Sequence, residues 1–206
     1  MLLCGVDEAG RGCSLGSLIV AAIIMDSEEL NKIKVKDSKK ISSKRRRSIL
    51  EKELQEKALE ISIVELTAEE INKYHDEGLT MNKMEVIAFT RALNNLELIP
   101  DEIYLDAADI LEFRFKNNIM KNYKHSDKDI KIISEHKADD NYPIVSAASI
   151  LAKTKRDSIM KKIAPVSGYG DKKTQEWLKN YYIENEKFPD ESRYFWKTLD
   201  NIKRKI

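Results

Sequence analysis

Two apolar segments near the start of the chain constrain its fold most strongly. Residues 2–7 (LLCGVD) and 17–25 (SLIVAAIIM) flank a stretch that contains Gly10, Gly12 and Gly16. Short apolar runs that are rich in branched aliphatic residues and bounded by glycine are typical of β-strands. The sequence therefore predicts two strands that are joined by a glycine-rich turn.

Further along the chain, the apolar pattern alternates between strand and helix spacing. The spacing predicts strands over residues 61–66, 102–106 and 130–134, and helices over residues 43–58, 82–96 and 144–163. A strand hairpin followed by alternating helices and strands favours an α/β fold in which helices cover a mixed sheet. In such sheets the reactive crevice lies at strand ends, where loops begin.

Length and composition limit the class of protein. A chain of 206 residues with 42% hydrophobic residues can bury one core, with a small appended lobe at most. No basic leader with a cleavage site precedes the first strand, and no apolar run reaches membrane-spanning length, so we expect a cytoplasmic protein without a membrane partner. The two cysteines, Cys4 and Cys13, are too few for a disulfide framework.

The net charge of +1 conceals a polarised distribution of charge. Residues 32–47 contain nine lysines and arginines and one aspartate, residues 48–112 are mainly acidic, and residues 151–206 are basic again. A solvated helix face explains any one of these runs, and residues 44–57 also fit an amphipathic helix. The combination makes a polyanionic partner worth testing.

Carboxylates follow several of the predicted strands. Asp7 and Glu8 come at the end of the first strand, Asp106 ends the fourth, and Asp139 follows the fifth. A lone aspartate at a strand end is usually a turn former or a helix N-cap. Four clustered carboxylates repel one another, a cost that a bound divalent cation removes, and oxygen ligands favour Mg²⁺ or Mn²⁺ over zinc. Two such ions would activate a water molecule and stabilise the leaving oxygen of a phosphoryl displacement.

The stretch from Asp7 to Gly12 raises two further expectations. Adjacent side chains on a strand point to opposite faces, so the strand must end or twist if Asp7 and Glu8 share a site; otherwise Glu8 acts through its backbone carbonyl or from the rim. Gly10 and Gly12, which flank Arg11, would let a nucleic-acid backbone approach the main chain. A plain β-turn is the alternative explanation.

Several motifs, in this order, resemble those of type 2 ribonuclease H (ribonuclease HII), most closely its archaeal members. They are DEAGRG at 7–12, DSKK at 37–40, YLDAAD at 104–109, EHKADDNYPIVSAASILAKTKRD at 135–157, SGYGD at 167–171 and FWKTL at 195–199. The resemblance implies an RNase H-like mixed sheet flanked by helices, with a catalytic domain over residues 1–160. It also implies a helical region over residues 161–206 that packs against this domain and contributes to substrate binding.

The resemblance also implies an activity. This is endonucleolytic cleavage of RNA in RNA/DNA hybrids, and of single ribonucleotides embedded in duplex DNA, by a two-metal mechanism with Mg²⁺ or Mn²⁺. The products would carry 3′-hydroxyl and 5′-phosphate ends. The implied role is removal of ribonucleotides and RNA primers during DNA replication and repair by a monomeric enzyme.

Carried over residue by residue, the resemblance assigns the four metal-binding carboxylates to Asp7, Glu8, Asp106 and Asp139. It prefers Asp106 and Asp139 to their neighbours Asp109 and Asp140. His136 precedes Asp139 by three residues and could orient it.

The resemblance implies substrate contacts as well. At Ser17 the chain departs from many relatives, which have a proline there. The implied contacts are a ribose sensor at Gly10, Arg11 and Gly12, a junction-reading tyrosine at Tyr169, and phosphate-binding positions at Lys39, Lys40, Lys153 and Ser149.

Two other interpretations remain open at this point. Another nuclease or strand-transfer enzyme of the same fold would share the carboxylates but would not need the ribose sensor or the tyrosine. A non-catalytic hybrid-binding protein would need only the basic groups. Incubation of a duplex that contains one ribonucleotide, with and without each metal, distinguishes the three.

Overall fold

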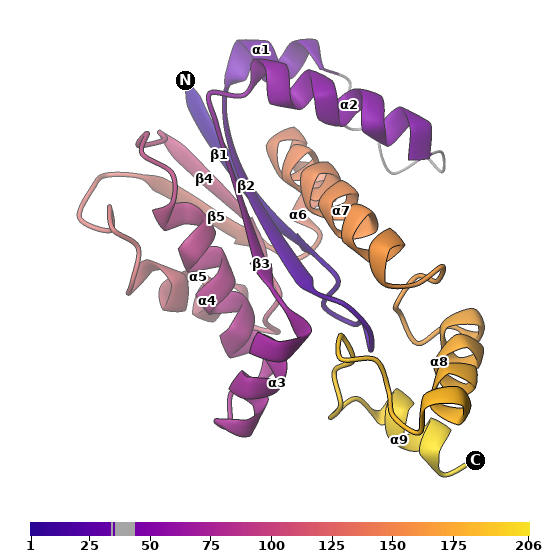
Figure 1. The fold of residues 1–206 in the computed structure, drawn as a ribbon. Helices are drawn as coiled ribbons and strands as arrows, with labels where there is room; N and C mark the ends of the chain where they lie inside the picture. Colours follow the sequence, from indigo (N-terminus) through magenta and orange to yellow (C-terminus); the bar gives the residue numbers. More distant parts are fainter. Residues whose placement is uncertain (34, 36–43) are drawn as a thin grey trace.

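The computed structural model of the protein describes residues 1–33, 35 and 44–206. Within these residues, strands form one sheet in the order β3-β2-β1-β4-β5 (Figure 1). The strands are β1 (Leu2–Ala9), β2 (Leu18–Asp26), β3 (Glu60–Leu66), β4 (Glu102–Asp106) and β5 (Lys131–Glu135). Each coincides with a segment predicted from the sequence, so the mixed α/β sheet is confirmed.

The sheet is antiparallel on one side of β1 and parallel on the other. β1 pairs antiparallel with β2 as far as Ala9, which lies opposite Ile19. Its parallel pairing with β4 stops earlier, at Val6 and Leu105. The carboxyl end of β1 therefore extends beyond the last residue of β4 with which it pairs. Within the described residues no strand other than β2 pairs with this part of β1, which we call its open edge.

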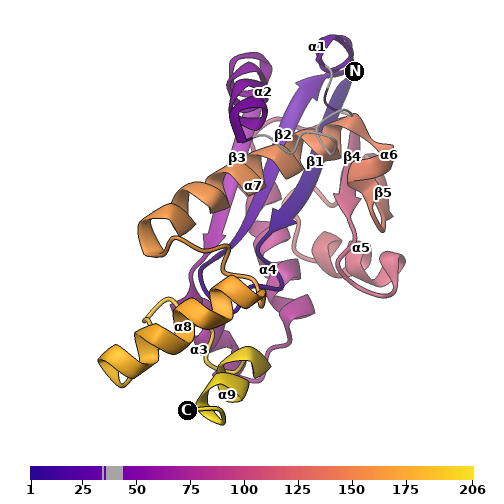
Figure 2. The same cartoon turned by 90° about the vertical axis from the view of Figure 1, so that its right-hand side faces the viewer.

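Helices cover both faces of the sheet, and none of those in the described ranges is long and apolar enough to cross a membrane. Helices α4 and α5 cover one face, and α7, together with α1 and α2, covers the other (Figures 1 and 2). The helices are α1 (Ser27–Lys32), α2 (Lys44–Lys57), α3 (Ala68–Asp76), α4 (Met81–Asn94), α5 (Glu112–Met120), α6 (Ala138–Asn141), α7 (Pro143–Ile163), α8 (Lys172–Asn185) and α9 (Lys197–Lys203). The three helices predicted from spacing correspond to α2, α4 and α7.

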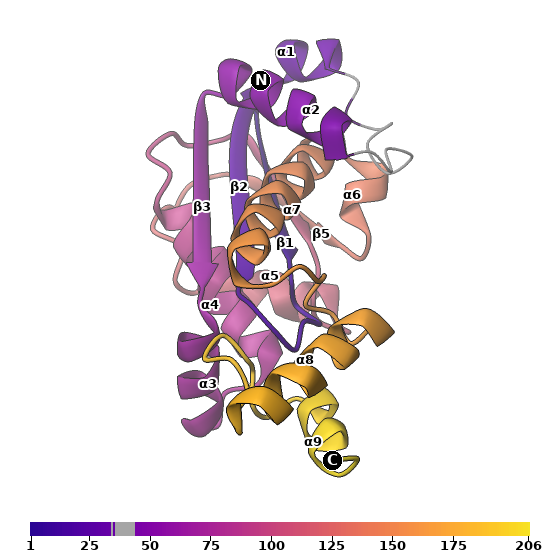
Figure 3. The same ribbon diagram turned by 45° about the vertical axis from the view of Figure 1, so that its right-hand side comes forward.

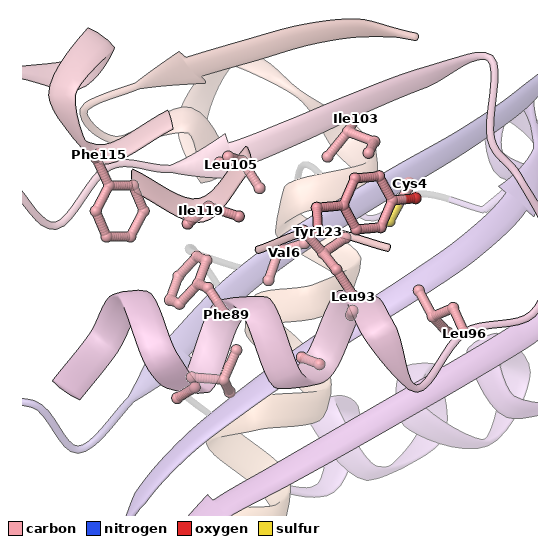
Figure 4. Packing of buried hydrophobic residues seen from close by; sticks show 14 of the residues in the cluster. Cys4, Val6, Phe89, Leu93, Leu96, Ile103, Leu105, Phe115, Ile119 and Tyr123 are labelled. Atoms are coloured by element: carbon pink, nitrogen blue, oxygen red, sulfur yellow. The ribbon is translucent and has the colours of Figure 1, made fainter. Parts of the chain in front are cut away.

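One hydrophobic core lies between the sheet and helices α4 and α5 (Figure 4). Alternation along β1 turns Cys4 and Val6 to this side, where both are fully buried. The rings of Phe89 on α4 and Phe115 on α5 pack edge to face, with their centroids 5.0 Å apart. This core holds α4 beside the carboxyl end of β1.

A second core lies under α7, which runs across β1 and β2 (Figure 2). The contact is closest at Gly5, where an added Cβ would lie 2.3 Å from the carbonyl oxygen of Ile144. The buried part of α7 is rich in small residues, including Ala147 and Ala148, which let the helix approach the strand. The backbone of α7 therefore lies directly on β1.

A third cluster joins the end of α7 to α8 and α9 (Figure 3). Met160 of α7 and Leu15 of the glycine-rich turn pack there against Leu178 and Leu199. The helices expected after residue 160 are thus present as α8 and α9. Their division from residues 1–160 as a separate region stays a prediction.

The packing at Gly5 predicts a large effect of one methyl group. Gly5→Ala should lower the free energy of unfolding by about 3 kcal/mol, because the helix backbone cannot yield to the new Cβ. Urea unfolding measures this change. Gly170→Ala is the control, since its nearest neighbour is the Thr198 hydroxyl at 3.2 Å, which can rotate away. Equal stabilities of the two variants would contradict the proposed packing.

Candidate active site

Three carboxylates meet at the open edge of β1. Oxygen atoms of Asp7 and Glu8 on β1 and of Asp106 at the end of β4 all lie within 4.8 Å of one another. The strand does not end at Asp7, since β1 continues to Ala9. Instead the pairing with β4 ends, and the Glu8 N–H donates to Asp7 Oδ1 at 2.7 Å. Adjacent residues on one strand can therefore share a site because the neighbouring strand leaves room for both side chains.

Asp139 lies beside this group at the start of α6. Its side chain is 11% exposed, and its Oδ2 is 3.9 Å from Lys153 Nζ on α7. Its charge contributes to raising the pKa of both Asp7 and Asp106. Its neighbour Asp140 is exposed. The structure thus brings Asp139 close to the three carboxylates.

The carboxylates hold their protons more strongly than usual. Burial, followed by the charge of Glu8, raises the pKa of Asp7 well above its usual value, although Ser149 and Lys153 oppose this shift. Burial and neighbouring carboxylates also raise the pKa of Glu8 to about 7. The pKa of Asp106 is raised to about 7 by burial and by Asp7. A cluster of buried carboxylates of this kind is destabilised when all its members are charged.

The cluster fits a divalent cation. Its donors are carboxylate oxygens, which suit Mg²⁺ and Mn²⁺. Among the described residues, the buried Oε2 of Glu8 has no hydrogen-bond partner. A cation bound by Asp7, Glu8 and Asp106 would satisfy this atom and remove the repulsion that raises the pKa values.

The Arg11 side chain turns into the protein. Its Nη1 donates to the carbonyl of Ala108 at 2.8 Å, its Nη2 donates to Asn82 Oδ1 at 2.6 Å, and its Nε lies 3.1 Å from Glu85 Oε1. Glu85 is fully buried on α4, and burial raises its pKa to about 8. The Arg11 side chain is therefore held against α4 and the loop after β4, although 38% of it stays exposed.

The two glycines beside Arg11 differ. Gly10 has a φ of 96°, and an added Cβ would lie 2.5 Å from the carbonyl oxygen of Ser17, so the fold itself requires glycine there. Gly12 is exposed, and the nearest atom to an added Cβ is Tyr169 Cδ1 at 4.0 Å. The fold does not require glycine at position 12.

Tyr169 lies beside the same turn. Its backbone forms an isolated antiparallel bridge with Cys13. The residue is 40% exposed, and the guanidinium carbon of Arg156 lies 4.4 Å from the ring centroid. Tyr169 is therefore a surface residue next to Gly12 and is held by a buried arginine of α7.

The structure locates two of the four residues that were expected to bind phosphates, and their role as substrate contacts stays a prediction. Ser149 and Lys153 both lie on α7 near Asp7, as their effects on its pKa indicate. Ser17, where the resemblance led us to expect a proline, donates its hydroxyl to Glu65 Oε1 at 2.6 Å. Lys39 and Lys40 lie outside the described residues.

Asp109 and His136 have structural partners. Asp109 forms an ion pair with Arg114 that lowers the pKa of Asp109. The ring nitrogens of His136 lie 3.0 Å from the Ala107 carbonyl and 3.3 Å from the Ile110 carbonyl. His136 therefore braces the loop after β4, and its orientation of Asp139 stays a prediction.

The raised pKa values predict how stability varies with pH when no metal is added. Unfolded carboxyl groups lose their protons near pH 4, whereas Glu8 and Asp106 keep theirs until about pH 7. The stability that these groups contribute is fully present below about pH 4 and is lost as pH rises through about 7, a change of a few kcal/mol.

Urea unfolding between pH 4 and 8 in the presence of a chelator measures this loss. The Asp106→Asn variant serves as the control, because its stability should decline less steeply over the same range. Excess Mg²⁺ should raise stability most at pH 8. Identical slopes for the two proteins would contradict the pKa assignment.

The contrast between the two glycines gives a matched pair of variants. Gly10→Ala should lower the free energy of unfolding by about 2 kcal/mol or more, because the alanine would be strained and would clash. Gly12→Ala should stay within about 0.5 kcal/mol of the original stability. The activity implied by the resemblance should nevertheless fall in Gly12→Ala, since a methyl group keeps a nucleic-acid backbone away. Full activity in Gly12→Ala would assign this residue to a plain turn.

Comparison with known proteins identifies the family of the chain. The family model described as ribonuclease HII matches residues 4–199. Ribonuclease HII of Thermococcus onnurineus is 42% identical over an alignment that covers 100% of this chain and 92% of the relative.

Solved structures agree as well. The crystal structure of ribonuclease H2 from Pyrococcus horikoshii superposes with a TM-score of 0.89 at 37% identity and covers 100% of this chain and 98% of that one. The RNase HII of Archaeoglobus fulgidus, solved in a complex with PCNA, gives a TM-score of 0.85 at 31% identity, over 97% of this chain and 96% of that one. The fold is therefore RNase H-like, as expected. The chain belongs to the ribonuclease HII family and is a ribonuclease H that acts on RNA/DNA hybrids.

Proposed function

We propose that Asp7, Glu8, Asp106 and Asp139 hold two divalent cations, Mg²⁺ or Mn²⁺, at which the RNA strand is hydrolysed. The observation that carries this proposal is the approach of three carboxylates within 4.8 Å, two of them with a pKa raised to about 7. Bound cations would supply activation of a water molecule and stabilisation of the leaving oxygen. The products are then 3′-hydroxyl and 5′-phosphate ends.

The chain's own residues position the substrate around this cluster. Lys153, whose side chain is 44% exposed, stands beside Asp139 and is placed to contact a phosphate. Ser149 is the neighbouring candidate on α7. Lys39 and Lys40 belong to the same proposal through the family resemblance alone.

Selection of ribonucleotides belongs to the turn at residues 10–12 and to Tyr169. The 2′-hydroxyl distinguishes RNA from DNA at a given sugar, and exposed backbone amides beside Gly12 can donate to it. The half-exposed ring of Tyr169 can pack on the sugar that follows, where a 2′-hydroxyl would be disfavoured. A site of this kind cleaves long hybrids and single embedded ribonucleotides.

This activity suits removal of RNA primers and misincorporated ribonucleotides during DNA replication and repair. We further propose that the protein is cytoplasmic and monomeric. The Archaeoglobus relative was solved in a complex with PCNA, so we add PCNA as a candidate protein partner.

Mapping the ends of cleaved fragments tests the reaction. A DNA duplex that contains one ribonucleotide, and a matched all-DNA duplex, are incubated with Mg²⁺, Mn²⁺ or a chelator. We expect metal-dependent cleavage of the first duplex alone, with 3′-hydroxyl and 5′-phosphate ends. Cleavage in the chelator, or cyclic phosphate ends, would refute the two-metal mechanism.

Carboxylate variants test the assignment of residues. Asp7→Asn and Asp139→Asn should each lower the cleavage rate by orders of magnitude, because each removes a charge and a donor from the cluster. Thermal unfolding should show that Asp7→Asn keeps or gains stability, since repulsion falls. The control is Asp140→Asn, which alters the exposed neighbour and should leave the rate near its original value. A larger loss in Asp140→Asn than in Asp139→Asn would reverse the assignment.

A further inference from the structure

A fully buried arginine lies behind the turn at residues 10–16. Arg193, in the segment between α8 and α9, has an exposed fraction of 0%. Its guanidinium donates from Nη2 to the Gly10 carbonyl at 2.7 Å, from Nη1 to the Arg11 carbonyl at 2.8 Å and from Nε to the Gly16 carbonyl at 3.0 Å. One side chain therefore holds three backbone carbonyls of one turn.

This arrangement is unusual for a buried charge. Buried arginines normally face a carboxylate, and burial without one is costly. Within the described part of the chain, Arg193 forms no ion pair, and burial lowers its pKa to about 10. The guanidinium is still charged at neutral pH. The three carbonyl acceptors, the ring of Trp196, 5.3 Å away, and the charge of Glu85 on α4 all favour its charged form.

The held carbonyls determine where the neighbouring amides point. In a trans peptide the N–H is directed opposite to the carbonyl of the same unit, and the described residues contain no cis peptide. Since the Gly10 carbonyl faces Arg193, the Arg11 N–H of the same peptide unit points away from the Arg193 side chain. Since the Arg11 carbonyl also faces Arg193, the Gly12 N–H points away as well.

These two amides are left without an acceptor. Among the described residues, neither the Arg11 nor the Gly12 N–H donates to another backbone or side-chain group. The next amides along the turn do donate, from Cys13 to the Gly10 carbonyl and from Ser14 to the Gly168 carbonyl. Between Arg11 and Ser14, the amides without an acceptor are therefore those of Arg11 and of the exposed Gly12.

The segment that delivers Arg193 is itself anchored. The Arg193 N–H donates to the Ser14 carbonyl at 2.9 Å, and Asn72 Nδ2 on α3 donates to the Ser192 carbonyl at 2.9 Å. Ser192 also bridges to Leu15. The backbone that carries the Arg193 side chain is thus anchored to the turn and to α3.

We propose that Arg193 is a positioning residue for ribose selection: by holding the Gly10 and Arg11 carbonyls, it directs the Arg11 and Gly12 amides toward the substrate as a pair of donors for a 2′-hydroxyl. This inference rests on the proposed function of the turn and names the residue that prepares it. Donors fixed in advance need no reorganisation when the ligand binds.

Binding without cleavage tests this role. In a chelator, fluorescence anisotropy gives the affinity for a DNA duplex with one ribonucleotide and for the matched all-DNA duplex. Arg193→Lys keeps the charge, but a single nitrogen cannot hold the Gly10, Arg11 and Gly16 carbonyls in the same fork. We expect the preference for the ribonucleotide duplex to fall about tenfold, while affinity for the all-DNA duplex changes little.

A matched control separates positioning from packing. Asn72→Ala loosens the same segment from outside but leaves the contacts of Arg193 with the turn. It should lower the unfolding temperature and keep the ribose preference. In Arg193→Ala, guanidinium ions at low millimolar concentration should restore the preference in part, whereas methylammonium ions should not.

Amide hydrogen exchange of the unmodified protein keeps the inference testable if the Arg193 variants do not fold. The Arg11 and Gly12 amides should exchange rapidly, and those of Cys13 and Ser14 slowly. Protected Arg11 and Gly12 amides, or an unchanged ribose preference in Arg193→Lys, would overturn the inference. An unmodified protein that shows no ribose preference would instead refute the proposed function of the turn.

Discussion

The direct packing of α7 on β1 is the contact on which the rest of the molecule depends. It is possible because Gly5 presents no side chain to the helix. From that fixed position, one stripe of α7 reaches each part of the site in turn, since residues three and four apart share a helix face. Its members are Ser149 near Asp7, Lys153 at Asp139, Arg156 under Tyr169, and Met160 in the cluster with α8 and α9.

The electrostatic character of the site follows from the same packing. The sheet and α7 bury Asp7 and its neighbours, and α4 adds Glu85, whose charge helps to raise the pKa of Glu8. The protein would be more stable if apolar residues replaced these buried carboxylates. The protein therefore keeps part of its structure under electrostatic repulsion, which the cations of the proposed function would relieve.

The positions of the strands and of the carboxylates at their ends were predictable, because both depend on local sequence pattern. The strands show as apolar runs, and Asp7, Asp106 and Asp139 follow from their positions after such runs. The short helix α3 was missed although Thr67 and Glu70 form a capping box, which is a readable signal. Glu85 was missed too, yet its place four residues before Phe89 puts a charge on the buried stripe of α4.

Other features depend on contacts that no local pattern records. The sequence left open how Asp7 and Glu8 could share a site, and the answer lies in where β4 stops pairing with β1. Arg193 resembles any surface arginine in the sequence, and its burial becomes visible only once the segment before α9 is folded against the turn. For the same reason, the sequence did not show that the ring of His136 lies against the carbonyls of the loop after β4.

The hydrogen bond between Arg193 and Gly10 joins residues 183 positions apart in the chain. During synthesis the first strands leave the ribosome long before Arg193 does, and they can pair as a local hairpin at once. The turn between them then exists without the guanidinium that holds its carbonyls. A growing chain can therefore build the sheet early, while the geometry of the turn at the open edge of β1 is completed only after the segment before α9 has emerged.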